Sequence, residues 1–297
     1  MKDLRIIHLP YFLYLKKNLK ELSGLQKLVF VLQGKIISFL NSKLSDKNFI
    51  FAINYFFNFK NKLQIEDNLI SITENDNKYY FPNIFRSLVF LHGFDIQHNL
   101  FLESYCLNKI NFQDNDVIID CGANLGELNL ALKSKNVKVK YIAFEPDKSV
   151  FYCLELNNID QNSILHNVAL SDKEEEKTLY VDSVGGNSSL QFFGVNENYK
   201  INCKKLDDYQ IDNIKLIKMD TEGHELEALK GSINTLNITE FVAVDFGNEK
   251  GENQDHTIVS VSNFLFSAGF ELFEYSNSRM VGLFRNKTYK REDLIEK

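Results

Sequence analysis

Val117-Ile-Ile-Asp-Cys-Gly-Ala-Asn-Leu-Gly126 is the stretch of sequence that decides the fold. Its first three residues are a short apolar run, typical of a strand that is buried on both faces. Gly122 permits a tight turn out of that strand, and Gly126 permits close approach of the backbone to a ligand. Asn124 and Glu127 have the spacing of a capping box, so we expect a helix to begin there. The stretch therefore predicts a strand, a glycine turn and a helix whose first amides face a ligand.

Downstream of this stretch, apolar runs alternate with helical segments. The runs lie at residues 139–144, 164–170, 216–217 and 241–244, and the helical segments at 125–132, 148–156, 225–229 and 257–266. This alternation predicts a parallel sheet covered by helices on both faces, with right-handed crossovers. The last two runs, 270–275 and 280–284, are separated by four residues, which permits only an antiparallel pair. We expect an α/β fold, a doubly wound Rossmann-like sheet with a terminal antiparallel hairpin.

The first hundred residues follow a different pattern. Residues 1–60 read as helical segments, and residues 63–81 alternate as a hairpin with a polar tip at 74–77. Residues 51–59 are so aromatic that we expect them to be buried. The predicted organisation is a mainly helical N-terminal cap region, residues 1–100, followed by a ligand-binding α/β domain, residues 101–297.

Charge is unevenly distributed along the 297 residues. The net charge of −6 argues against a nucleic-acid partner, yet residues 1–49 contain nine Lys and Arg against three Asp and Glu. Leucines and lysines interleave there, which fits either peripheral contact with an anionic membrane or, the interpretation we favour, an apolar stripe packed on the core. No apolar stretch is long enough to span a bilayer, and no export signal is recognisable. We expect a cytoplasmic protein that works near the inner membrane surface.

The four cysteines have neither paired nor zinc-like spacing. They are Cys106, Cys121, Cys153 and Cys203. We expect buried free thiols in a reducing compartment.

Acidic residues follow two of the predicted strands. Glu145, with Pro146 after it, ends the second strand about 20 positions beyond the glycine turn, where a carboxylate can accept the two hydroxyls of a ribose. Asp220 ends the fourth strand, at the edge where open α/β sheets bind their ligands. Glu222 lies beside it, and several carboxylates at one strand end require a cation, a basic substrate or a raised pKa. These positions predict a site rather than a core.

Four motifs, in this order along the chain, resemble the FkbM-type S-adenosylmethionine-dependent methyltransferases of class I. They are Asp120-Cys-Gly-Ala-Asn-Leu-Gly, Phe144-Glu-Pro, Asn167-Val-Ala-Leu-Ser and Lys218-Met-Asp-Thr-Glu-Gly-His-Glu. The resemblance covers about residues 100–286, and its most distinctive element is Asp-x-Glu-Gly-x-Glu at 220–225. Residues 204–209 resemble the short Leu-Asp strand that the family places before that element. Cys121 and Thr221 depart from the family pattern. At both positions the side-chain volume is close to that of the residue usual in the family.

This resemblance implies methyl transfer from S-adenosylmethionine to a hydroxyl, often on a sugar of a surface polysaccharide, glycolipid or natural product. Asp220 is the first candidate for the general base, with His224 and Glu222 behind it. The residues expected to contact the cofactor are Asp120, Gly122, Ala123, Asn124, Gly126, Glu145, Pro146, Ala169 and Asp220. The acceptor contacts suggested by the sequence are Arg86 and the loop 185–189, and residues 1–100 are expected to cover the acceptor side of the sheet.

Other interpretations stay open at this point. Asp220 and Asp245 end neighbouring strands and would suit Mg²⁺, although we expect no metal. A nicotinamide-dependent oxidoreductase would use the same sheet, but the glycine spacing here is G-x-x-x-G rather than G-x-G-x-x-G. A non-catalytic adaptor would keep the fold without needing Asp220, Glu222 and Glu145 together. A nucleic-acid methyltransferase would not suit the acidic core, which repels phosphates.

Overall fold

The computed structural model describes residues 22–159, 162–182, 188–276 and 279–289. The chain forms two compact units, Met1–Asn99 and Leu100–Lys297. Within the described residues, no helix is both long enough and apolar enough to cross a membrane.

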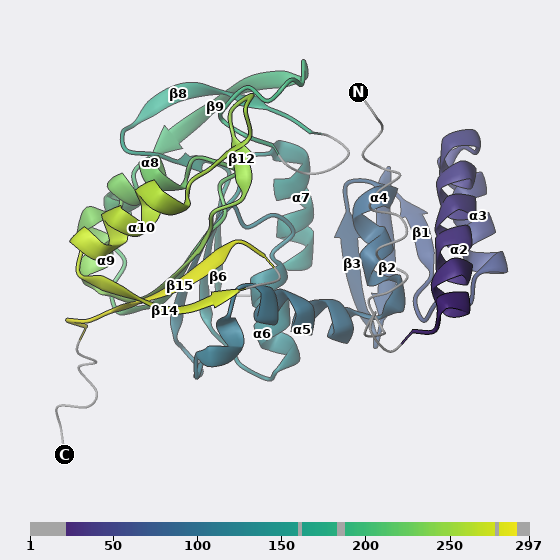
Figure 1. Cartoon of the computed structure of the whole chain (residues 1–297), viewed down its shortest axis with the longest axis horizontal. Helices are drawn as coiled ribbons and strands as arrows, with labels where there is room; N and C mark the ends of the chain where they lie inside the picture. Colours follow the sequence, from purple (N-terminus) through teal and green to yellow (C-terminus); the bar gives the residue numbers. More distant parts are fainter. Residues whose placement is uncertain (1–21, 160–161, 183–187, 277–278, 290–297) are drawn as a thin grey trace. The chain divides into compact units, whose positions relative to one another are not determined.

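The first unit contains helices and a small antiparallel sheet (Figure 1). Its elements are α2 (Gly24–Lys43), α3 (Asp46–Phe56), β1 (Leu63–Glu66), β2 (Leu69–Glu74), β3 (Asn77–Phe81), α4 (Ile84–Ser87), the 3-10 helix η1 (Leu88–His92) and α5 (Phe94–Ser104), which continues into the second unit. The predicted hairpin is confirmed: β2 pairs with β3, and the tip residues Asn75 and Asp76 take left-handed backbone angles. β1 adds a third strand, in the order β1-β2-β3.

The helices of the first unit bury only part of their apolar surface. α3 contacts β1 and buries Phe49 and Ile53, while α2 contacts α3 and buries Gly34 and Ile37. Three aromatic side chains of α3 are more than 60% exposed: Phe51 (64%), Tyr55 (72%) and Phe56 (71%). The prediction that residues 51–59 are buried is therefore wrong, because α3 has only one face against the unit.

The second unit is built on a seven-stranded sheet with the order β14-β15-β11-β10-β4-β5-β6 (Figure 1). Its strands are β4 (Val117–Cys121), β5 (Lys140–Phe144), β6 (Ser163–His166), β10 (Ile214–Met219), β11 (Thr239–Asp245), β14 (Phe270–Ser276) and β15 (Val281–Asn286). The neighbouring strands from β11 to β6 pair in parallel, and β15 pairs antiparallel with both β11 and β14. The doubly wound sheet and its terminal hairpin are confirmed.

Helices cover both faces of this sheet. They are α6 (Glu127–Ser134) and α7 (Lys148–Asn157) on one face, and α8 (Glu225–Lys230), α9 (Ile233–Asn237) and α10 (Ile258–Ser267) on the other. Successive strand residues point to opposite faces, so Ile118 belongs to the core cluster with α6, and Ile119 belongs to the cluster with α8. Both faces are therefore apolar, and the polar residues of the domain concentrate at the strand ends.

The region between β6 and β10 differs from the sequence-based expectation. The predicted run 164–170 divides: β6 ends at His166, and β7 (Ala169–Leu170) joins a second sheet with the order β7-β9-β8. The strands of this second sheet that the sequence did not indicate are β8 (Glu175–Tyr180) and β9 (Asn198–Lys204). The predicted Leu-Asp strand is instead a 3-10 helix, η3 (Leu206–Asp208). Three short elements complete the unit: η2 (Leu107–Lys109), β12 (Asn248–Lys250) and β13 (Asp255–His256). All four cysteines are buried free thiols, as predicted.

Candidate active site

The predicted site residues gather at the carboxyl ends of four neighbouring strands. β11, β10, β4 and β5 lie side by side in this order. Asp245 is the last residue of β11, Asp220 follows β10, Gly122 follows β4, and Glu145 follows β5. Parallel strands place these ends at one edge of the sheet, which is where open α/β folds bind ligands.

The turn after β4 is held mainly by its neighbours in the sheet. The amides of Gly122 and Ala123 both donate to the carbonyl of Phe144, at 2.9 and 3.0 Å. A Cβ on Gly122 would lie 1.8 Å from the carbonyl oxygen of Asp220. Glycine is therefore required here because β10 ends so close to the turn.

Gly126 serves packing rather than close approach of a ligand. A Cβ there would lie 1.9 Å from Asn158 Nδ2 and 2.8 Å from Leu154 Cδ1, both near the end of α7. The predicted capping box is wrong: α6 begins at Glu127 with Gly126 as its N-cap and has no side-chain capping bond. Asn124 instead takes a left-handed backbone angle, φ 54°, which turns the chain between the strand and the helix.

Glu145 joins the turn after β4 to the turn after β5. Its carboxylate accepts hydrogen bonds from the amides of Asn124 and Asp147, each at 2.9 Å, and it is buried. The Asn167 side chain donates to the carbonyls of Glu145 and Pro146, at 2.8 and 3.1 Å. The hydrogen bonds from the two amides use one carboxylate oxygen each and fix Glu145 at the edge of the sheet. Ala169 lies in β7 and is buried.

Asp120 is part of a buried ion pair beneath the site. Lys218 Nζ lies 3.0 Å from Asp120 Oδ1 and donates to the Gly122 carbonyl at the same distance. The Tyr141 hydroxyl donates to Asp120 Oδ2 at 2.7 Å. Burial lowers the pKa of Lys218, but the charges of Asp120 and Asp220 outweigh burial and raise it overall. Lys218 is therefore a fixed positive charge between the two strands.

Asp220 is held by three neighbours through one oxygen. Its Oδ2 accepts from the Tyr105 hydroxyl, lies 3.1 Å from Arg279 Nη2 and 3.8 Å from Lys218 Nζ. Burial raises the pKa of Asp220, but Arg279, Lys218 and the Tyr105 hydroxyl together lower it. Its Oδ1 is buried and has no hydrogen-bond partner. Asp220 is thus an ionised group with one oxygen available.

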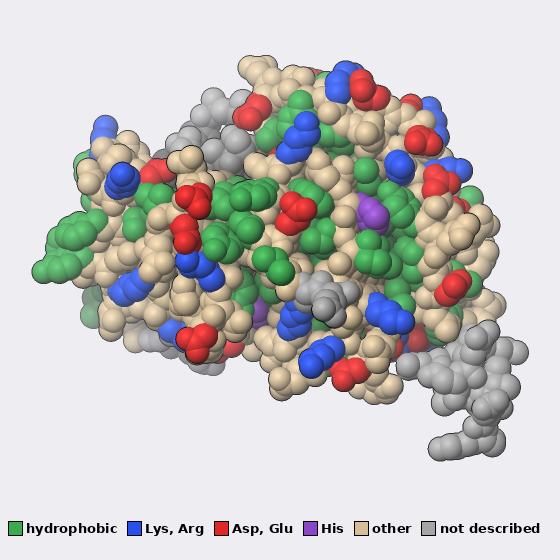
Figure 2. Space-filling model, turned by 180° about the vertical axis from the view of Figure 1, so that it is seen from behind, with side chains coloured by type: hydrophobic (Ala, Val, Ile, Leu, Met, Phe, Trp, Pro, Cys, Tyr) green, Lys and Arg blue, Asp and Glu red, His purple; other side chains and the backbone are tan. Residues whose placement is uncertain are grey.

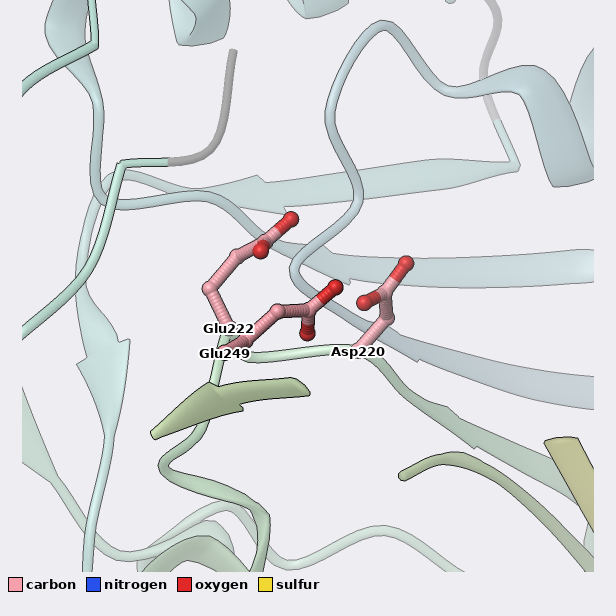
Figure 3. Close-up of side chains that lie close together, drawn as sticks. All are labelled: Asp220, Glu222 and Glu249. Carbon is pink, nitrogen blue, oxygen red and sulfur yellow. The ribbon is translucent and has the colours of Figure 1, made fainter. Parts of the chain in front are cut away.

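The carboxylate of Asp220 lies close to two further carboxylates. Figure 3 shows Asp220 and Glu222, from the loop after β10, with Glu249 of β12, and one oxygen from each lies within 4.8 Å of the others. Each of the three has one buried oxygen without a hydrogen-bond partner. Burial and the charge of Asp220 raise the pKa of Glu222 well above its usual value and the pKa of Glu249 to about 8. We call Asp220, Glu222 and Glu249 the carboxylate cluster.

The cluster also contains the residues with geometry for a divalent cation. The sequence predicted Asp220 and Asp245 as the pair of metal ligands, but Asp245 is not part of the carboxylate cluster. Arg279 Nε contacts Asp245, and Arg279 Nη2 contacts Asp220, so one guanidinium binds both predicted ligands. Glu249 was missed although it follows Asp245 closely in sequence, since only the fold of β12 turns it toward Glu222.

The loop between β10 and α8 is organised by Glu225. Its buried carboxylate accepts from the amides of Thr221 at 3.1 Å and Gly223 at 2.9 Å, and from the Thr257 hydroxyl at 3.2 Å. Burial raises the pKa of Glu225 to about 7. Glu222 takes a left-handed backbone angle, φ 53°, in the loop that these bonds close. The acidic motif at 220–225 therefore combines a structural glutamate with cluster carboxylates.

His224 has contacts of a different kind. It is buried at the N-terminus of α8, with Nε2 3.0 Å from the Ser171 hydroxyl and Nδ1 3.8 Å from Glu227 Oε2. Burial and the charge of Lys177 lower the pKa of His224 to about 4. It is therefore neutral near pH 7, and its neighbours are Ser171, which follows β7, and Glu227 of α8, neither of which belongs to the carboxylate cluster.

The remaining predicted contacts lie elsewhere. Residues 185–187 of the predicted acceptor loop are outside the described residues. The side chains that follow them tie the loop to the site: Ser188 donates to Asp147 Oδ2 at 3.0 Å, and Ser189 donates to the Glu222 carbonyl at 2.7 Å. Arg86 belongs to α4 of the first unit, where its amide donates to Asn83 Oδ1 at 3.1 Å.

Sequence reasoning also missed Tyr105, Lys218 and Arg279. Lys218 had a signal, because a lysine inside a fully buried parallel strand needs a buried partner. Arg279 lies in the connection between the last two strands, and no local pattern indicates that its side chain contacts Asp220 after β10.

Comparison with known proteins identifies the family. The family model described as "Methyltransferase FkbM domain" matches residues 120–272. "Methyltransferase 1" of Beauveria bassiana (strain ARSEF 2860) is 25% identical over 235 residues, which cover 68% of this chain and 88% of that protein. "Methyltransferase sdnD" of Sordaria araneosa is 29% identical over 167 residues, covering 43% of this chain and 64% of that protein.

Solved structures of methyltransferases are also similar to this chain. The crystal structure of "Methyltransferase FkbM" from Methylobacillus flagellatus KT has a TM-score of 0.44 and 18% sequence identity, over 68% of this chain and 55% of that chain. This chain therefore matches about half the length of that protein. The family match itself spans more than half of the present chain. The protein belongs to the FkbM family of S-adenosylmethionine-dependent methyltransferases.

Proposed function

We propose that the methyl acceptor is a hydroxyl of a sugar or glycan-type molecule. The observation that carries this proposal is the carboxylate cluster, in which three buried oxygens have no hydrogen-bond partner. Carboxylates accept hydrogen bonds, and hydroxyl groups donate them. A polyhydroxylated acceptor can satisfy several of these oxygens at once, whereas an apolar acceptor would leave them buried and unsatisfied, which is costly.

The site also fits the charge of the cofactor. S-adenosylmethionine supplies a methyl group on a positively charged sulfur, already activated for displacement. Near the end of β10, Lys218 and Arg279 stand against the carboxyl groups of Asp120, Asp245 and the cluster. This excess of acidic groups favours a cationic ligand. Glu145 is the residue we propose for the ribose hydroxyls, because the amides of Asn124 and Asp147 fix its carboxylate at the end of β5.

The other proposed cofactor residues divide into two groups. Asn124 and Ala123 form the turn that faces the edge of the sheet, together with Pro146 after β5, and we propose that these line the adenosyl moiety. Asp120, Gly122 and Gly126 have partners within the protein, so we propose that they shape the turn instead of contacting the cofactor. Ala169 stays a proposed neighbour of the adenine.

The task of the protein in this reaction is alignment and proton removal. Holding the acceptor oxygen in line with the methyl group and its sulfur supplies on the order of 7–11 kcal/mol of barrier lowering. A general base with a pKa near the working pH is most efficient. Asp220, the first sequence-based candidate, has a lowered pKa, while Glu249 has a pKa of about 8. We therefore propose that Asp220 orients the acceptor hydroxyl and that the cluster takes its proton through Glu249, with Glu222 as the alternative within the coupled set.

Mg²⁺ is a second partner for the same oxygens, because it prefers carboxylate and water ligands. Arg279 already supplies positive charge to Asp220, so we propose that transfer does not require a divalent cation. Turnover should be unchanged after exhaustive chelation. A loss of turnover that added Mg²⁺ restores would contradict this.

The acceptor is tested directly with the purified protein and S-adenosylmethionine. Candidate sugars, glycolipids and hydroxylated natural products are incubated with both and analysed by mass spectrometry for the gain of one methylene. We expect products methylated on oxygen. A product methylated on nitrogen or carbon would contradict the proposed acceptor class.

Cofactor binding is tested separately by calorimetry with S-adenosylhomocysteine. Glu145→Gln should weaken binding at least about tenfold, because a charged acceptor for the ribose hydroxyls is lost. Glu155→Gln, an exposed position on α7, is the matched control and should bind as the wild type does. If the wild type, Glu145→Gln and Glu155→Gln all bind equally, Glu145 does not contact the cofactor.

A further inference from the structure

The first unit has a row of apolar side chains on the outer side of α2. Six residues of that helix are between 45 and 73% exposed: Leu25, Leu28, Val29, Leu32, Ile36 and Phe39. Apart from the adjacent pair Leu28 and Val29, they follow one another at three or four residues, which places all six on one face of the helix. We call these six residues the α2 stripe. Figure 2 shows green side chains at the outer edge of this unit.

The α2 stripe is separate from the face that packs. The buried residues of α2 are Gly34 and Ile37, which lie on the other side of the helix. α2 contacts α3, and α3 contacts β1, so α2 is the outermost layer of the first unit. The sequence-based preference for an apolar stripe packed on the core is therefore wrong for Leu25, Leu28, Val29 and Leu32. Six apolar side chains exposed on one face of a helix mark an interaction surface.

The charge around the α2 stripe indicates what binds it. Residues 22–57 contain four exposed lysines, Lys27, Lys35, Lys43 and Lys47, and a single acidic residue, Asp46. The chain as a whole has a net charge of −6, so positive charge is concentrated on the same two helices that expose apolar side chains. A second copy of this surface would bring like charges together, whereas an anionic surface would be attracted.

We propose that α2 docks on an anionic lipid bilayer. The α2 stripe enters the boundary between headgroups and acyl chains, the helix lies in the membrane plane, and the lysines contact anionic headgroups. This is the binding mode of basic helices with one apolar face. It does not depend on the proposed methyl acceptor, since it uses no residue of the carboxylate cluster.

Co-sedimentation of the full chain with vesicles tests the proposal. Phosphatidylcholine vesicles are compared with vesicles that also contain phosphatidylglycerol, at low and high salt. The wild type should sediment with the anionic vesicles, and salt should reduce this because it screens the lysines. Leu32→Gln combined with Phe39→Gln should abolish sedimentation. Lys35→Gln combined with Lys43→Gln should weaken it about tenfold or more, because each lysine near an anionic surface adds to binding.

A matched control distinguishes docking through the α2 stripe from nonspecific binding through other exposed apolar side chains. Ile233→Gln combined with Val259→Gln removes two apolar side chains that are as exposed, 55% and 62%, but belong to the second unit. This variant should sediment as the wild type does. Circular dichroism checks that each variant is folded, and light scattering gives its mass in solution.

Three results would overturn the proposal. The first is a wild type that does not sediment with anionic vesicles. The second is equal loss in the α2 stripe variant and in the second-unit control. The third is a wild-type dimer that Leu32→Gln with Phe39→Gln converts to a monomer without any vesicle binding, which would assign the stripe to a second copy of the chain.

Discussion

Lys218 and Arg279 give each acidic side chain at the end of β10 a different chemical character. Asp120 is paired with Lys218, and Asp220 is contacted by both cations. Glu222 and Glu249 form no ion pair with either cation, so burial and repulsion by Asp220 raise their pKa values. Residues of the same type therefore differ in pKa, and this difference is the basis of our proposal that Asp220 orients the acceptor and Glu249 takes its proton.

The ion pair of Lys218 and Asp120 leads to a stability prediction. Both side chains are almost fully buried, with 3% and 1% of their surface exposed. Lys218→Met would leave the Asp120 charge buried and unpaired, so the free energy of unfolding should fall by about 3–5 kcal/mol. Urea denaturation measures this. Lys218→Met combined with Asp120→Asn should recover part of the loss, and a double variant as unstable as the single one would show that the pair is not the cause.

The raised pKa of Glu249 leads to a prediction about pH dependence. A base must be deprotonated to accept a proton, so turnover should rise with pH up to a pKa of about 8 and then level off. Glu249→Gln should lower turnover by about 10²–10⁴-fold and abolish this rise. Steady-state rates across pH measure both effects.

Glu252→Gln is the control for this experiment, because Glu252 is exposed and close in sequence. It should keep the wild-type profile. If Glu249→Gln retains the rise of turnover with pH, the base is another residue, and Glu222→Gln is then the variant to compare.

At the scale of elements, the turn between β4 and α6 depends on how closely α7 packs. Gly126 has a left-handed backbone, φ +80°, and its missing Cβ leaves room for Asn158. A glycine at this position is also expected in a phosphate-binding turn. The presence of glycine therefore does not indicate whether a ligand or a helix lies against the turn. The structure shows that a helix does.

Gly126→Ala should therefore combine backbone strain with a steric clash. Gly269 has a similar backbone angle, φ +91°, but nothing lies within 4 Å of its Cβ position. Gly269→Ala should cost about 1 kcal/mol of unfolding free energy from strain alone, and Gly126→Ala should cost about 1–3 kcal/mol more from overpacking. Equal denaturation midpoints for the two variants would show that Asn158 moves aside freely.

For the whole molecule, the two units differ in what they contribute. Among the described residues, the two large core clusters of the second unit are made of buried residues from Leu102 onward. A variant that lacks residues 1–93 and keeps α5 should fold and bind S-adenosylhomocysteine as the full chain does. It should lose acceptor preference if residues 1–100 cover the acceptor side, as expected from the sequence. Calorimetry and methylation of a panel of acceptors measure these properties, and unchanged preference in a folded variant would contradict the cover.

Local sequence patterns were sufficient for the doubly wound sheet, its terminal hairpin and the edge at which Glu145 and Asp220 lie. These features follow from short-range periodicity, because a strand buried on both faces must be apolar throughout and a four-residue connection must reverse the chain. The third strand was misjudged, because residues 164–170 resemble one apolar run although His166 and Asn167 interrupt it, and the two parts belong to different sheets. The capping box failed for a similar reason: Asn124 has the right spacing, but its amide is bound to Glu145.

The tertiary structure alone decided the chemistry of the site. Tyr105, Asp220 and Arg279 are far apart in the sequence, and they meet because α5, β10 and the terminal hairpin end at the same place. Contact between a charge and its partner depends on distances in space, which no spacing along the chain encodes. The sequence by itself determined the family, the sheet and the strand-end acids. Folding determined which acid is paired with a cation, which acids have a raised pKa, and that the apolar side of α2 faces solvent.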